Sequence, residues 1–239
     1  MAIPALGWTA GPTAGRCART PGGGTLDAMI DTAPAPAEVT QTAPRWWLPV
    51  VVLLLGAGGG VLTEWLQGVL DDPWAAWANS VAAWCLPAFA VGALAGRVRV
   101  AVVAAVATEL LLVGSYYVSQ YAQLLPVDGV TVAGWLVAGV LAGVVFGVAG
   151  HWWRAGEPRT AVAGAALMSG AVVGEGLYRA VAFPWQGSSG AVMAAAGVVL
   201  AVLLGRTWRQ RLTVLGLLAA VVPLAWLGTV VVDAAFATW

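Results

Sequence analysis

Four charged side chains fall inside long apolar stretches of this sequence: Glu64, Glu109, Glu175 and Arg179. A charge at the centre of a bilayer costs about 2.5 kcal/mol or more on insertion scales, so such residues usually mark a ligand site or a proton path. Glu109 falls near the middle of its apolar stretch. Because desolvation disfavours a charged carboxylate, we expect Glu109 to be protonated or hydrogen-bonded to a polar neighbour.

Polar residues repeat at helical spacing beside these charges. Tyr116 and Gln120 follow Glu109 on one stripe, and Glu175 and Arg179 form an i, i+4 pair. These stripes predict one polar pocket in the outer half of a membrane. The proposed ligand-binding residues are Glu64, Gln67, Asn79, Glu109, Tyr116, Gln120, Glu175, Tyr178 and Arg179.

Three carboxyl groups against one guanidinium favour a small cationic or proton-coupled ligand. Two simpler interpretations remain open. Glu175 and Arg179 could neutralise each other, and Glu64 could lie close enough to the membrane surface to be hydrated.

The elements that must position these residues are apolar helices. Of the 239 residues, 60% are hydrophobic and 9% charged, whereas soluble domains carry about 25% charged residues. Seven apolar stretches are each about long enough to cross a ~30 Å hydrocarbon core at 1.5 Å per residue. The sequence therefore predicts an all-α, polytopic transmembrane helical bundle with seven helices, at 46–70, 74–96, 100–121, 130–153, 160–182, 188–205 and 212–233.

The arginines predict the orientation of the bundle. All eleven basic residues are arginine, and every one except Arg179 falls on the same predicted side as the N-terminus. Basic loops stay in the cytoplasm. We therefore expect the N-terminus inside, the C-terminus outside, and a multi-pass location in the inner (plasma) membrane.

Residues 1–44 are rich in Ala, Pro, Gly and Thr and contain no apolar run. This composition predicts a disordered cytoplasmic tail, followed by a transmembrane helical domain over 45–239. No apolar signal-peptide region precedes Trp46, and Met29 is an alternative start.

Small residues predict how the helices pack. Gly139, Gly143 and Gly147 form a doubled GxxxG pattern, which allows two helix backbones to approach closely. Most such ridges should pack inside the monomer, and one could instead bind another membrane protein.

Enzyme and metal motifs lack their partner residues. The sequence Gly-Ser-Ser-Gly over 187–190 matches the GxSG of rhomboid proteases, but the sole histidine, His151, is predicted at the opposite membrane face. Asp71-Asp72 has no second aspartate-rich motif, and a chain without lysine cannot form a Walker A loop. We predict no catalytic residues, no metal and no cofactor. Because the net charge is zero, we also predict no nucleic-acid partner.

Several segments resemble an actinobacterial family of small membrane proteins known only as a domain of unknown function. They include Asn79-Ser80, Gly-Ser-Tyr-Tyr over 114–117, the glycine-rich 143–150 and Glu-Gly-Leu-Tyr-Arg over 175–179, and the resemblance covers about residues 48–205. It implies a lineage but no activity. The architecture is also similar to the substrate-binding subunits of energy-coupling-factor transporters, which usually have six helices.

The leading hypothesis is a non-enzymatic membrane protein that binds or helps to transport a small molecule. The first alternative is a membrane enzyme acting on a lipid or isoprenoid, with Glu109 or Glu175 as acid or base; it requires two carboxylates facing a lateral slot. The second is a scaffold, which requires an exposed Gly139–Gly147 ridge.

Overall fold

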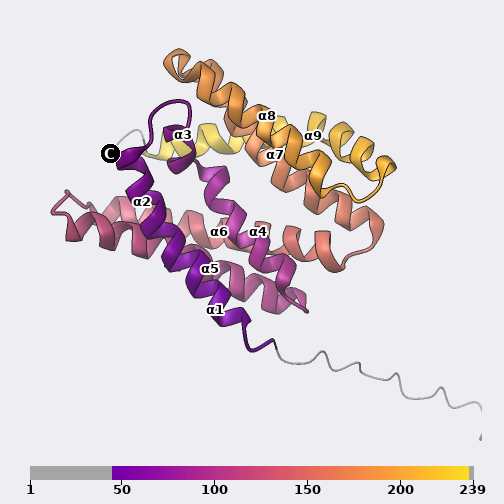
Figure 1. Ribbon diagram of the computed structural model, residues 1–239, viewed down its shortest axis with the longest axis horizontal. Coiled ribbons are helices and arrows are strands. Elements are labelled where there is room, and N and C mark those ends of the chain that lie inside the picture. The colour runs from indigo at the N-terminus through magenta and orange to yellow at the C-terminus, as the bar shows by residue number, and fades with distance from the viewer. Residues whose placement is uncertain (1–44, 237–239) are drawn as a thin grey trace, which may run out of the picture. The chain divides into compact units, whose positions relative to one another are not determined.

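The computed structural model describes residues 45–236, in which every regular element is a helix (Figure 1). The predicted tail at 1–44 and the last three residues lie outside the described residues. In chain order the elements are α1 (Leu48–Leu53), the π-helical η2 (Leu54–Gly58), α2 (Gly59–Val69), α3 (Ala75–Ala78), α4 (Val81–Leu94), α5 (Val98–Ala122), α6 (Gly129–Ala155), α7 (Pro158–Ala182), the 3-10 helix η3 (Pro184–Gln186), α8 (Gly187–Leu204) and α9 (Trp208–Phe236).

Six stretches of helix in the described part of the chain are long and apolar enough to cross a membrane. Each has 21 to 29 residues, and they are Leu48–Val69, Val98–Ala122, Gly129–Ala155, Pro158–Ala182, Pro184–Leu204 and Trp208–Phe236. These lengths correspond to about 30 Å or more of helix. The chain is therefore a multi-pass helical membrane protein, and these six stretches agree with predicted spans to within a few residues.

The prediction of a continuous helix over 74–96 is wrong. The chain leaves the helical conformation at Asn79 and Ser80, between α3 and α4. α4 has 14 residues, or about 21 Å of helix, which is shorter than the hydrocarbon core. The cause is local, because Ser80 adopts extended backbone angles and its side chain accepts a hydrogen bond from the Ala83 N–H, as an N-cap does.

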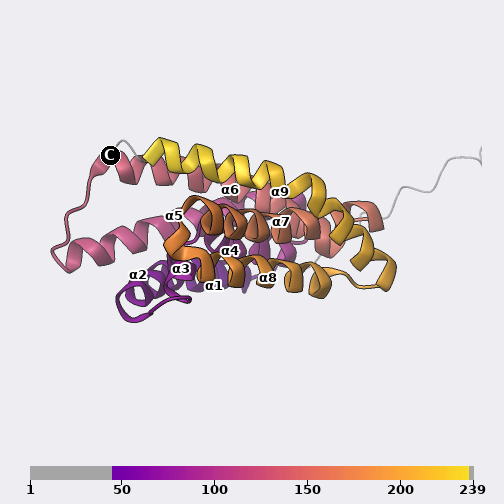
Figure 2. The same cartoon turned by 90° about the horizontal axis from the view of Figure 1, so that it is seen from above.

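α7 is the most buried of the six long helices. It contacts α6, α8 and α9, while α5 and α6 pack against each other and against α4. Figure 2 shows α9 running beside α7, with α8 next to α7. α9 is the least buried of the six, so most of its surface is available to lipid.

The glycine ridges lie inside the bundle. A methyl group added at Gly143 would lie 2.6 Å from the Cα of Val106, and one added at Gly174 would lie 2.6 Å from the Cβ of Ala225. A methyl group added at Gly92 would collide with the backbone of Gly147. Close packing of α6 on α5 and α4, and of α7 on α9, therefore depends on these glycines. A scaffold role would require the Gly139–Gly147 ridge to be exposed, but the three glycines of this ridge are buried.

One end of the bundle is rich in arginine. Arg206 donates to the carbonyl groups of Trp153 and Arg154, and Arg45 donates to that of Leu94. These bonds join helix ends that are distant in sequence. The arginine-rich end consists of Arg45, Arg97, Arg99, Arg154, Arg159, Arg206, Arg209 and Arg211.

Candidate functional site

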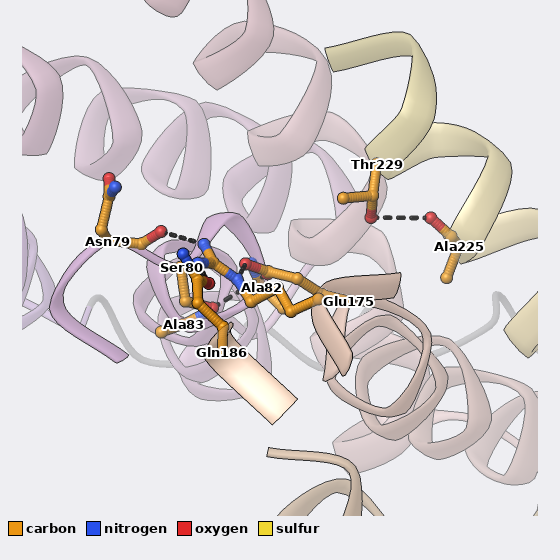
Figure 3. A network of polar contacts seen from close by, with 9 residues as sticks. Asn79, Ser80, Ala82, Ala83, Glu175, Gln186, Ala225 and Thr229 are labelled. Carbon is orange, nitrogen blue, oxygen red and sulfur yellow. Dashed lines mark hydrogen bonds and ion pairs between the residues drawn. The ribbon is translucent and has the colours of Figure 1, made fainter. Parts of the chain in front are cut away.

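Glu175 of α7 reaches the break between α3 and α4. Its Oε2 accepts hydrogen bonds from the Ser80 hydroxyl at 2.9 Å and from the Ala82 N–H at 2.7 Å (Figure 3). The first N–H groups of a helix lack partners within the helix, and the positive end of its dipole attracts a carboxylate. Glu175 therefore caps the start of α4 from a neighbouring helix.

Arg179 completes this network. Its Nε donates to Glu175 Oε1 at 2.8 Å, so the predicted i, i+4 pair is confirmed. One terminal nitrogen donates to Gln186 Oε1 at 3.0 Å and the other donates to the carbonyl group of Asn79. Both oxygens of Glu175 are therefore occupied. We refer to Ser80, Glu175, Arg179 and Gln186 as the break network.

A second polar group joins α2, α3 and α5. The Tyr116 hydroxyl donates to Gln67 Oε1 at 2.9 Å and accepts from Gln120 Nε2 at 2.9 Å. Gln67 Nε2 donates in turn to the carbonyl group of Ala78 at 3.1 Å. The predicted stripe on α5 therefore faces the bundle at Tyr116, and it holds α2 against the end of α3.

Glu109 has a different environment. Only 2% of its surface is exposed, yet it forms no hydrogen bond or ion pair with any described residue, and its Oε1 is buried without a partner. It lies beside a narrow cavity between α4, α5 and α6, lined also by Trp84, Cys85 and Trp135. About 30 Å³ of this cavity is open to water, which is enough for a small number of water molecules.

An adjoining cavity extends this space toward the break. It shares Val81, Trp84 and Trp135 with the cavity at Glu109, adds Asn79, Ser80, Tyr116 and Tyr117, and has about 50 Å³ open to water. We call the two cavities together the tryptophan crevice.

The walls of the tryptophan crevice are aromatic. The ring centroid of Trp84 lies 5.7 Å from that of Trp135 and 5.3 Å from that of Tyr116. The indole N–H of Trp84 is buried and, like Glu109 Oε1, has no partner. An unpaired donor and an unpaired acceptor therefore line the same crevice, and buried polar groups in this state are rare.

The predicted site residues do not form a single pocket. The Tyr178 hydroxyl donates to Asp233 Oδ2 of α9 at 2.8 Å. Glu64 is half-buried and forms no hydrogen bond or ion pair with the residues that the structure describes. The expectation that Glu109 would pair with Glu64 or with the Glu175–Arg179 pair is wrong, because none of these groups bonds to it. Asn79 and Tyr116 are the predicted residues that share the tryptophan crevice with Glu109.

The sequence pattern of a family of unknown function, DUF6518, matches residues 39–238. The chain belongs to this family. No curated protein and no solved structure matches it. The predicted resemblance to an uncharacterised family is confirmed, whereas these comparisons support neither the actinobacterial lineage nor the likeness to energy-coupling-factor subunits.

The list of predicted site residues omits several that matter in this DUF6518 chain. Trp84 and Trp135 line the crevice, Ser80 caps α4, and Asp233 binds Tyr178. In the predicted helices at 74–96 and 130–153 the two tryptophans fall several residues from the ends, where interfacial anchors lie; that position was the available signal. Within residues 45–236, no group of three His, Cys, Asp or Glu side chains could hold a metal ion.

Proposed function

We propose that this protein binds, or helps to transport, a small cationic or proton-coupled ligand, and that Glu109 is the carboxyl group at the centre of the site. One observation carries the proposal: Glu109 is buried near the middle of α5 with no partner, beside a cavity large enough for water. A structural carboxyl at this depth would be expected to have a bonded partner, as Glu175 does.

The walls of the tryptophan crevice suit a cation. Indole and phenol rings attract positive charge at their faces, most strongly when the cation is desolvated. A protonated Glu109 would leave the crevice neutral, whereas an ionised Glu109 would favour an ion such as Na⁺, K⁺ or a small ammonium. The volume open to water fits ligands of this size and is far below the 300–1,000 Å³ typical of a drug-sized ligand.

The alternative hypotheses receive less support. A lipid-modifying enzyme with two catalytic carboxylates would need a second carboxylate beside Glu109, but both oxygens of Glu175 bond to the break network. A scaffold acting through the Gly139–Gly147 ridge would need a surface that α5 and α4 already cover.

For the orientation, we propose that the arginine-rich end faces the cytoplasm and that the end of α9 at Phe236 lies outside, with the protein in the plasma membrane. Support comes from the arginine distribution and the positive-inside rule. A single cysteine placed at Gly156, with Cys17 and Cys85 replaced, should react with an impermeant maleimide only after the cells are opened. Strong labelling of intact spheroplasts would show that residue 156 lies outside, which is the opposite of the proposed orientation.

Glu109→Gln tests the functional proposal, because it removes the titrating group while keeping its size. Purified protein is titrated with NaCl, KCl and tetramethylammonium chloride at constant ionic strength, and the midpoint of thermal unfolding is recorded at several pH values. We expect at least one cation to raise the midpoint of the wild-type protein, more strongly at high pH, and Glu109→Gln to abolish that rise.

Infrared difference spectroscopy supplies a second readout. The carbonyl band of a protonated Glu109 should disappear as the pH rises, and it should be absent from Glu109→Gln. The matched control is Glu157→Gln, which changes an exposed glutamate before α7. Responses of Glu109→Gln that equal those of the wild type in both measurements would exclude Glu109 as the binding group.

A further inference from the structure

Another cavity lies between α1 and the first half of α5, and it shares no lining residue with the tryptophan crevice. It has a volume of about 640 Å³ and is open to the surroundings. Its floor includes Leu48, Val52 and Ala104, which are buried, and its rim includes Leu53 and Val103, which are 55% and 69% exposed. We call this cavity the α1–α5 groove.

The dimensions of the α1–α5 groove suit a hydrocarbon chain. On α5 its lining runs from Arg99 to Ala107, about 12 Å along the helix. Apart from Arg99, the lining residues are apolar. In the hydrocarbon core such a groove excludes water and accepts a lipid tail.

Arg99 gives the α1–α5 groove a polar end. It is exposed, belongs to the arginine-rich end, and forms no hydrogen bond or ion pair with any residue that the structure describes. Its guanidinium is therefore free to bind an anion, and its planar shape matches the oxygens of a phosphate group. Arg97 lies two residues before it and is also exposed, which adds positive charge at the same level.

We propose that the α1–α5 groove binds one acyl chain of an anionic phospholipid whose phosphate group pairs with Arg99. An apolar channel that ends at an unpaired cation is complementary to an amphiphile with an anionic head. A free phosphate would leave the apolar channel unused, and a neutral lipid would leave Arg99 without a counter-charge. This site is independent of the proposed function of Glu109.

The test compares lipids with the same acyl chains. Protein stripped of lipid in detergent is titrated with phosphatidylglycerol, phosphatidylcholine or soluble glycerol 3-phosphate, and binding is followed by native mass spectrometry. We expect phosphatidylglycerol to bind more tightly than phosphatidylcholine, and glycerol 3-phosphate to show no saturable binding. One arginine near an anionic head group accounts for an approximately fivefold effect, so Arg99→Gln should weaken phosphatidylglycerol binding about fivefold and leave phosphatidylcholine unchanged.

Two further variants fill the apolar part of the groove while keeping Arg99. Ala107→Phe and Val103→Trp should each reduce the binding of both lipids, and the second changes a residue exposed enough to leave folding intact. Arg209→Gln is the matched control, because Arg209 is an exposed arginine at the same end of the bundle, on α9. It should bind both lipids as the wild type does.

Three results would overturn the proposal: equal affinity of the wild type for the two lipids, equal loss of phosphatidylglycerol binding in Arg209→Gln and Arg99→Gln, or saturable binding of glycerol 3-phosphate. A wild-type dimer that Ala107→Phe or Val103→Trp converts to a monomer would also overturn it, since the groove would then hold a second copy of the chain.

Discussion

Glu109 and Glu175 are buried to the same extent, with 2% of each residue exposed, but their surroundings differ. Glu175 accepts bonds from Ser80, Ala82 and Arg179 and thereby caps α4. Glu109 has no partner and lies beside a cavity. Burial by itself therefore does not indicate the role of an intramembrane carboxyl group. The number of donors that converge on it separates a structural glutamate from a candidate binding residue.

The largest effect should come from removing Glu175. Glu175→Leu leaves the Ala82 N–H and the Ser80 hydroxyl without the carboxylate that accepts from them, and it removes the only carboxylate bonded to Arg179 among the described residues. Removing one partner of a buried ion pair costs about 3–5 kcal/mol, so we expect a large fall in the midpoint of thermal unfolding in detergent. Glu175→Gln keeps an oxygen for the Ala82 N–H, so its midpoint of thermal unfolding should lie between those of Glu175→Leu and the wild type. A Glu175→Leu protein as stable as the wild type would show that Glu175 does not have a structural role.

The next largest loss of stability is expected from a substitution in α6, the helix that contributes Trp135 to the tryptophan crevice. At Gly143→Leu the new side chain would meet the backbone of Val106, where even a Cβ atom has only 2.6 Å. Overpacking of this kind costs about 1–3 kcal/mol, because α6 must move away from α5. Gly216→Leu is the control, since a Cβ atom at Gly216 has no neighbour within 4 Å. Equal thermal stability of the two variants would mean that α6 does not depend on close packing at Gly143.

A smaller effect on stability is expected at Tyr116, which both lines the tryptophan crevice and forms structural hydrogen bonds. It lines the tryptophan crevice, and its hydroxyl bonds to Gln67 and Gln120. Tyr116→Phe removes these bonds while keeping the aromatic wall, which should cost about 1 kcal/mol. The cation response attributed to Glu109 should persist, because the ring remains. A loss of that response without loss of stability would make the Tyr116 hydroxyl part of the binding site.

The smallest effect on stability is expected at Glu109. Glu109→Leu breaks no hydrogen bond to any described residue, and replacing an unpaired buried polar group by an apolar one is often neutral or stabilising. The midpoint of thermal unfolding should therefore be unchanged or higher, while the cation response disappears. This outcome is the opposite of the one expected if Glu109 had polar partners. Destabilisation as large as that of Glu175→Leu would show that Glu109 is structural.

The membrane class and most of the helices were predictable from the sequence. Runs of about 20 apolar residues with few charges have one stable solution in a bilayer, the helix, and the Glu175–Arg179 pair follows from i, i+4 spacing on a single helix. The break at Asn79–Ser80 was harder to predict, because the residues around it are apolar and helix-compatible. Ser80 supplies a local N-cap, but the carboxylate that accepts from the Ser80 hydroxyl and the Ala82 N–H belongs to Glu175, a residue 95 positions later.

The sequence by itself determined that this chain is a helical membrane protein, which residues carry charge into the membrane, and which helix faces are small enough for close packing. These properties depend on composition and on the period of one helix. Only the tertiary structure decided which buried glutamate is bonded and which is not. That difference arises from contacts between helices: α7 brings Glu175 to the start of α4, whereas α4 and α6 present the side chains of Trp84 and Trp135 near Glu109 and supply no donor bonded to it. Spacing along a single helix carries no information about such contacts.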